Sequence, residues 1–273
     1  MAYFSATAST SPKRRMRVEI VTIAPMPAAC ARAAGVAAMV TISTRIRRFG
    51  EVLAIAEKHA DVYCSVGTHP HNADEERDIR VDEIVRLARH PKVVAIGEAG
   101  LDYHYQHSSP EAQADGFRRH IAAARTTGLP LEIHTRDADA DTIRILEDEH
   151  AKGAFQAILH CFTGGRELAL RALDLGLYVS FTGVVTFKKA DALRGIAAEV
   201  PLDRLLVETD APYLAPEPYR GKTNEPAFVV HTAAAIAKTR GISNEELAVA
   251  TTDNFFRLFT KAPRPAATGT AAA

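Results

Sequence analysis

The sequence predicts a single-domain α/β protein with the TIM-type (β/α)8 barrel fold, on three observations. The chain has 273 residues, close to the ~250 that are typical of one such barrel. Short β-branched runs alternate along it with segments of helical periodicity. This alternation predicts parallel strands, because each helix returns the chain to the same end of the sheet. An open doubly wound sheet is disfavoured, because no glycine-rich phosphate loop follows the first run.

Eight short runs are predicted to be the barrel strands, and apolar residues dominate each of them, as expected for strands buried on both faces. They are residues 18–23, 38–43, 62–66, 93–97, 131–134, 157–160, 177–181 and 205–208. The helices between them mix alanine and leucine with charged residues, which is typical of helices that cover a barrel. They are residues 45–59, 81–88, 111–127, 137–149, 167–175 and 191–199.

Two more helices are expected after the eighth strand, at residues 227–238 and 243–259. Ser243 and Glu246 have the spacing of a capping box at the start of the second. We expect both helices to close the bottom or the side of the barrel. The barrel then spans residues 17–262, and the tails 1–16 and 263–273 are expected to be disordered because they have little apolar surface to bury.

Composition excludes several function classes. The chain has 33 Lys and Arg residues and 33 Asp and Glu residues, so its net charge does not attract it to nucleic acid or membranes. A polyanion would have to bind at a local site. Three well-separated cysteines indicate a reducing compartment rather than a disulfide framework. No run approaches the ~20 apolar residues of a membrane span, and charged residues and prolines interrupt the early apolar segment. We therefore expect a cytoplasmic protein with no membrane partner.

Chemistry-bearing residues recur at the carboxyl ends of the predicted strands, where catalytic groups lie in this fold. Glu98, His134, His160 and Asp210 occupy these ends on strands four, five, six and eight. Imidazoles with carboxylates suit Zn²⁺, Mn²⁺ or Mg²⁺. The pattern predicts a hydrolytic metal centre in which Glu98 bridges ions and Asp210 binds one and orients the attacking water.

Four sequence strings resemble the TatD family of metal-dependent deoxyribonucleases, within a resemblance that runs from about residue 31 to 264. They are GEAGLDY at 97–103, HCFTG at 160–164, ETDAPY at 208–213 and RGKTNEP at 220–226. The resemblance implies a two-ion centre with ligands at Glu98, His134, His160 and Asp210. It places His69 beside the metals and has Arg220, Asn224 and Glu225 shape the adjacent loop.

The start of the chain departs from the family pattern. Family members begin with a strand that ends in His-x-His, whereas the first histidine here is His59, and Glu19 is the only acidic residue of the first predicted strand. Three explanations are open: a degraded first metal site, a shifted reading frame at the start, or other ligands. The abrupt change near Ala31 favours the shifted frame. We expect this chain to bind one divalent ion, at Glu98, His134 and His160.

The predicted function is divalent-metal-dependent hydrolysis of phosphodiester bonds, with DNA ends or single strands as the substrate class that the resemblance implies. Lys188, Lys189, Arg220 and Lys222 follow strands seven and eight, the loops that often hold phosphate in barrels. Two alternatives stand beside it. One is an amidohydrolase or deacylase, and the other is an inactive barrel that serves as a binding module. The sequence sets no oligomeric state, and a monomer is compatible with it.

Several neighbouring residues receive simpler interpretations. His104 and His107 are expected in a solvated loop, with substrate contact as the alternative. Asp102 is expected to orient a neighbouring group, and Cys161 to pack as a small apolar residue rather than to act as a nucleophile.

Overall fold

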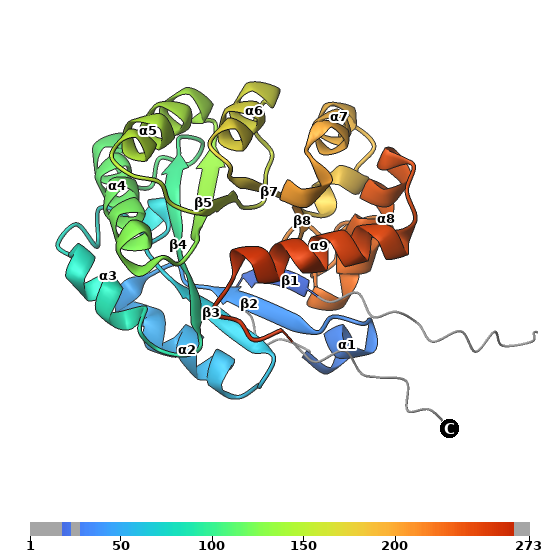
Figure 1. Cartoon of the computed structure of the whole chain (residues 1–273), viewed down its shortest axis with the longest axis horizontal. Coiled ribbons are helices and arrows are strands. Elements are labelled where there is room, and N and C mark those ends of the chain that lie inside the picture. Colours follow the sequence, from blue (N-terminus) through green and yellow to red (C-terminus); the bar gives the residue numbers. More distant parts are fainter. Residues whose placement is uncertain (1–17, 23–27, 265–273) are drawn as a thin grey trace, which may run out of the picture.

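The computed structural model describes residues 18–22 and 28–264, and for residues 18–22 only the backbone is considered. The strands are β1 (Val18–Thr22), β2 (Ala38–Ile42), β3 (Val62–Val66), β4 (Val93–Asp102), β5 (Leu131–Arg136), β6 (Ala157–Leu159), β7 (Tyr178–Phe181) and β8 (Leu205–Val207). They form one parallel sheet in the order β1 to β8, which curls until β1 lies beside β8 (Figure 1). The predicted α/β barrel class is confirmed.

The helices follow the strands along the outside of the sheet (Figure 1). They are α1 (Ala28–Ala33), α2 (Phe49–Glu57), α3 (Val81–Leu87), α4 (Pro110–Thr127), α5 (Asp139–Ala151), α6 (Arg166–Asp174), α7 (Asp191–Glu199), α8 (Val229–Arg240) and α9 (Asn244–Leu258). Ser243 caps α9 by accepting a hydrogen bond at 3.0 Å from the amide of Glu246, so the predicted helix start is confirmed. The short helix α1 was not expected from the sequence.

Two apolar clusters hold the barrel together. The larger one fills the space between the sheet and the surrounding helices. The smaller one lies inside the barrel near the starts of the strands, where Phe255 of α9 and Phe259, which follows this helix, pack with Tyr63, Val94 and Leu206. Helix α9 therefore closes the amino end of the barrel, and α8 lies beside α7 on its side. Replacing the buried Phe255 by alanine is expected to cost about 3–5 kcal/mol of stability.

Strand β4 is longer than its prediction, which ended at Gly97. It continues to Asp102, and all of its residues are buried. Gly97 and Gly100 permit this extension, because both have positive φ angles, +128° and +147°, that only glycine adopts readily. A Cβ on Gly97 would lie 2.7 Å from the Glu132 carbonyl oxygen. The two glycines therefore allow β4 to run closely along β5, and this brings Glu98 toward His134.

Parts of the predicted organisation lie outside the described residues. These are the predicted tail 1–16, residues 17 and 23–27 of the predicted barrel, of which Ile23 belongs to the first predicted strand, and residues 265–273 of the second tail. Residues 263–264 are described, and they are exposed and have no regular secondary structure. In the described part of the chain, no helix combines the length and apolar character needed to cross a membrane.

Candidate metal centre

The Glu98 carboxylate is the point on which the candidate site converges. Its Oε1 lies 2.8 Å from Nδ1 of His134, 3.5 Å from Nε2 of His69 and 3.8 Å from Nε2 of His160. Donor atoms of His69, Glu98 and His134 all lie within 4.8 Å of one another. Nε2 of His160 lies 3.8 Å from Oδ1 of Asp210. The structure thus brings the four predicted ligands and His69 to one end of the barrel.

The second ring nitrogens of two histidines face carboxylates, and this distinguishes them as ligand candidates. Nδ1 of His160 lies 2.9 Å from Glu208, and Nε2 of His134 lies 3.0 Å from Asp102. A carboxylate at one imidazole nitrogen holds the proton there and leaves the other nitrogen for a metal. His160 then presents Nε2 to the centre, and His134 presents Nδ1.

His69 has a different arrangement. Its Nδ1 accepts a hydrogen bond at 3.0 Å from the backbone amide of His71, so the neutral ring carries its proton on Nε2, the atom that faces Glu98. Burial lowers the pKa of His69 to about 3, which keeps the ring neutral. The sequence led us to expect His69 beside the metals. At this position the ring would act as a hydrogen-bond donor.

Charge at the centre follows from the close packing of these groups. Burial acts to raise the pKa of Glu98, but His69, His160 and His134 outweigh it and hold this pKa well below its usual range. Burial acts to lower the pKa of His134, yet its hydrogen bonds to Asp102 and Glu98 raise it to about 9. The pKa of His160 is also raised, because Glu208 and Glu98 outweigh burial. The carboxylates therefore favour positive charge between them, and this donor set fits a divalent ion.

Two residues that support the ligands differ in how well the sequence identified them. Glu208 is fully buried, and besides facing His160 it accepts hydrogen bonds from the Cys161 amide at 2.6 Å and the Ser180 hydroxyl at 2.7 Å. Sequence reasoning missed Glu208. Its position two residues before Asp210 was the available signal, because alternate residues along a strand share a face. Asp102 orients His134, in the role expected for it.

The backbone is strained at the two strand ends that carry His160 and Asp210. Cys161 and Asp210 have φ angles of 45° and 54°, in the left-handed region that residues other than glycine occupy at a cost. Such strain concentrates at functional sites. Burial raises the pKa of the Cys161 thiol well above its usual value, which fits the packing role expected for this residue.

Asn224 anchors the loop after β8. Asn224 is buried, and its side-chain amide donates hydrogen bonds to the carbonyls of Thr209 at 2.8 Å and Tyr213 at 2.6 Å. The amide of Glu225 donates to the Asn224 side chain at 2.9 Å. The exposed Arg220 guanidinium lies 4.2 Å from the centre of the Phe187 ring in the loop after β7. The three residues thus lie in the loop after β8, and the shaping role that the resemblance implies for them stays a prediction.

The parallel barrel, with a buried carboxylate ringed by imidazoles at the carboxyl ends of its strands, is typical of barrel metal-dependent hydrolases. The sequence model of the family described as TatD related DNase matches residues 25–260. A metal-dependent hydrolase of Escherichia coli K12, YcfH, is 46% identical over 218 residues, which cover 80% of this chain and 81% of the relative. The chain therefore belongs to the TatD family of metal-dependent hydrolases.

Two further comparisons support this placement. The protein named 3'-5' ssDNA/RNA exonuclease TatD, from Citrobacter koseri, is 37% identical over 236 residues, which cover 84% of this chain and 90% of that one. The crystal structure of YJJV, a TatD homologue from Escherichia coli K12, superposes with a TM-score of 0.80 at 26% identity and covers 90% of this chain and 98% of that one. The fold and the family resemblance predicted from the sequence are confirmed.

Proposed function

We propose that this chain hydrolyses phosphodiester bonds of DNA, at ends or in single strands, with the help of a divalent ion. The observation that carries this proposal is the convergence of His134, His160 and Asp210 with Glu98 at one end of the barrel. The relative from Citrobacter koseri, named an exonuclease for single-stranded DNA and RNA, supports nucleic acid as the substrate class.

Glu98, His134 and His160 would hold the ion. Glu98 and Asp210 would be the carboxylates of a second metal site, for which this chain lacks the two imidazoles of the family pattern. A bound Mg²⁺, Mn²⁺ or Zn²⁺ supplies Lewis-acid chemistry, which stabilises charge on a phosphoryl oxygen and lowers the pKa of water from ~15.7 toward ~7. The Asp210 side chain is 16% exposed, so a carboxylate at this rim can orient water and accept its proton. His69, neutral and protonated on Nε2, would donate a hydrogen bond to the Glu98 carboxylate that its Nε2 faces.

Cationic side chains near the centre give the phosphate backbone a local partner in a chain with no net charge. Lys188, Lys189, Arg220 and Lys222 are exposed on the loops after β7 and β8. Contacts from such residues to phosphate position a strand without reading its sequence. The proposal includes a cytoplasmic location. Action as a monomer is compatible with it.

The test compares substrate classes. The purified chain is incubated with Mg²⁺, Mn²⁺ or Zn²⁺ and either an end-labelled single-stranded oligonucleotide or a panel of N-acyl and ester substrates. We expect shortened oligonucleotides and no acyl cleavage, with loss of product in Asp210→Asn. Asp115→Asn, an exposed α4 carboxylate, is the matched control and should retain activity. Acyl cleavage without oligonucleotide cleavage would favour the amidohydrolase, and metal-independent oligonucleotide binding without any cleavage would favour the binding module.

A further inference from the structure

The loop between β4 and α4 presents an aromatic ring at the edge of the metal centre. Tyr105 is 51% exposed, and in the part of the chain that the structure describes only Tyr213 and Val249 join it as exposed large apolar residues. A single exposed ring is ordinary on a protein surface. The surroundings of Tyr105 are not ordinary, because they hold the ring in place while half of it stays open to solvent.

Four side chains surround the Tyr105 ring, and with it they form what we call the rim cluster: His71, His104, Tyr105, His107 and Arg136. The His107 ring is nearly parallel to Tyr105, at 12° and 5.7 Å between centroids. The rings of His104 and His71 meet it edge-on at 4.7 and 5.5 Å. Tyr105 is therefore oriented by aromatic contacts before any ligand arrives.

Arg136 adds an available positive charge to the rim cluster. Its guanidinium carbon lies 4.8 Å from the centre of the Tyr105 ring, and this residue ends strand β5, two residues after His134. Across residues 28–264, no ion pair involving Arg136 is found, although most of the other arginines there have one. An arginine on an aromatic ring with no carboxylate partner is suited to contact a phosphate.

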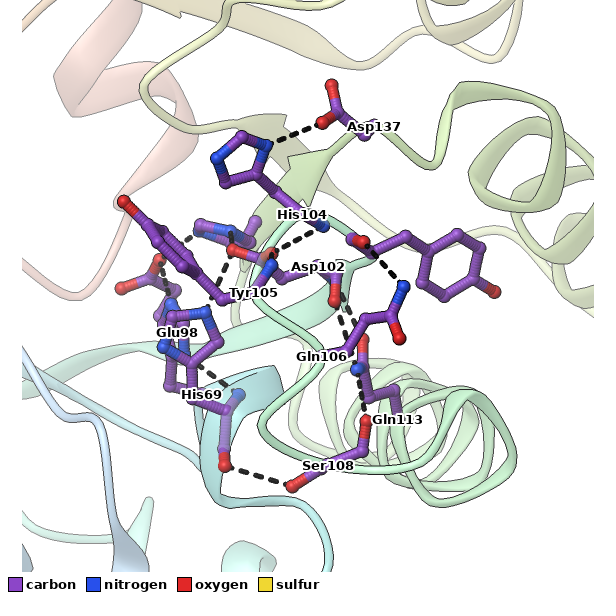
Figure 2. A network of polar contacts seen from close by, with 12 residues as sticks. His69, Glu98, Asp102, His104, Tyr105, Gln106, Ser108, Gln113 and Asp137 are labelled. Atoms are coloured by element: carbon purple, nitrogen blue, oxygen red, sulfur yellow. Dashed lines mark hydrogen bonds and ion pairs between the residues drawn. The ribbon is translucent and has the colours of Figure 1, made fainter.

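Asp102 connects the rim cluster to the metal centre. It is 1% exposed, and its Oδ1 accepts hydrogen bonds at 3.0 Å from the backbone amides of both His104 and Tyr105. Its Oδ2 lies 3.0 Å from His134 and 2.9 Å from His71. Figure 2 shows Asp102 in the middle of this network, with the Tyr105 ring extending from the loop toward the side where Glu98 lies. One carboxylate thus fixes both a predicted metal ligand and the backbone of Tyr105.

We propose that Tyr105 stacks on a nucleobase of single-stranded nucleic acid, next to the phosphodiester held at the metal centre, while Arg136 contacts an adjoining phosphate. This inference rests on the proposed function and adds a positioning residue to it. Exposed aromatic rings beside cations are the usual means of binding single strands without sequence preference. Bases in a duplex are already stacked on each other, so such a ring favours single strands.

The test asks whether loss of the Tyr105 ring and loss of one base of the oligomer affect the same contact. It uses the whole protein, freed of metal so that no cleavage occurs. Binding of a short fluorescein-labelled oligothymidylate is followed by anisotropy, together with a series of oligomers that carry one abasic residue at each position in turn. Tyr105→Leu should weaken binding of the intact oligomer roughly 5- to 150-fold, the range expected for one stacked base. An abasic residue at one position of the oligomer should weaken its binding to the parent protein by a similar factor. Combining this oligomer with Tyr105→Leu should weaken binding little further.

Controls separate stacking from a structural role of the loop. Tyr105→Phe keeps the ring and should bind within about twofold of the parent, whereas Gln106→Asn changes a neighbouring exposed side chain and should bind equally well. In cleavage assays, Tyr105→Leu should raise KM for single strands and leave the affinity for a duplex of the same sequence unchanged.

Additive losses at every abasic position, or full affinity in Tyr105→Leu, would overturn the stacking proposal. If Tyr105→Leu does not fold, the abasic series on the parent protein decides alone, because a series with no sensitive position contradicts stacking. Cleavage of the oligomer with unchanged KM in Tyr105→Leu would leave the proposed hydrolysis standing without the stacking. If the losses from Tyr105→Leu and from one abasic position do not add, yet no tested metal supports cleavage, the stacking would stand and the proposed hydrolysis would be contradicted.

Discussion

The Glu208 carboxylate lies 2.9 Å from Nδ1 of His160, and both side chains are buried. The negative charge of Glu208 favours a proton on Nδ1 of His160, and Nε2 faces Glu98 and Asp210. The Glu208 carboxylate would thereby fix the orientation and raise the basicity of His160, which we expect to be a metal ligand.

Glu208→Gln should weaken binding of the divalent ion about 10- to 100-fold, the usual cost of losing such a supporting partner. The glutamine fills the same space but carries no charge to strengthen the imidazole. Isothermal titration with Mn²⁺ measures the affinity, with Asp115→Asn as the remote control. Equal affinities in Glu208→Gln and the parent would show that His160 is not a ligand or does not depend on this contact.

Metal affinity should depend on pH through His134. Its pKa is raised to about 9 in the metal-free site, and an ion can bind only the deprotonated nitrogen. The pKa of His160 is raised as well, so below about pH 9 the ion must displace one or two protons, and the apparent affinity should rise about tenfold per pH unit for each proton displaced. Titrations in buffers of different ionisation enthalpy count the protons released. A pH-independent affinity would contradict the assigned protonation.

Glu132 should make the metal-free protein less stable as the pH rises. It is fully buried in β5, neither carboxylate oxygen has a well-formed hydrogen bond within the described residues, and burial raises its pKa to about 8. Between its unfolded pKa near 4.5 and about 8, the folded state binds more protons than the unfolded state. The contribution of Glu132 to the free energy of unfolding therefore falls with rising pH, by at most about 1.4 kcal/mol per pH unit.

Glu132→Gln should remove this dependence and be more stable than the parent at pH 8. Urea unfolding of both proteins in the presence of a chelator, at several pH values, gives the difference. Parallel stability curves for the two proteins would show that Glu132 does not titrate in this range.

Replacing residues 1–30 with a strand that ends in His-x-His tests how much the first strand limits activity. Glu98 and Asp210 are present in the rest of the barrel, and the two imidazoles are the groups that the family pattern adds. The chimera should bind two ions and cleave oligonucleotides faster by orders of magnitude, because two metals stabilise both the attacking and the leaving oxygen. Metal analysis, melting temperature and cleavage rate are compared with the parent. A chimera that binds two ions yet cleaves no phosphodiester would contradict the nuclease proposal.

Most of the barrel could be predicted because its strands are buried on both faces and therefore appear as short apolar runs between helical segments. The end of β4 could not, since Gly97 and Gly100 are typical of a strand end. In the folded chain these glycines instead permit close approach to β5. Helix α1 has only six residues and lacks a clear capping signal, so nothing marked it.

The place of a candidate site residue could be predicted where its position on a strand decides which end of the barrel it occupies. Glu98, His134, His160 and Asp210 follow this rule, because the carboxyl ends of parallel strands meet. The groups that orient them depend on contacts between elements far apart in the sequence. Glu208 reaches across to His160, and His71 meets Asp102, and spacing alone shows neither contact. His104 and His107 are exposed, as expected for a solvated loop, but their ring contacts with Tyr105 could not be predicted from the sequence.

The most direct test of a metal-dependent phosphodiesterase centred on Glu98 measures metal content and cleavage together. Glu98→Gln and Glu132→Gln change two buried carboxylates on neighbouring strands. Glu98 lies within 4 Å of nitrogens of three histidines, whereas among the described residues Glu132 forms no ion pair. Elemental analysis and cleavage of an end-labelled oligonucleotide with Mn²⁺ should show about one bound ion and cleavage in both the parent and Glu132→Gln. Glu98→Gln should lose both the ion and the cleavage. Retention of the ion and of full cleavage by Glu98→Gln would contradict the account.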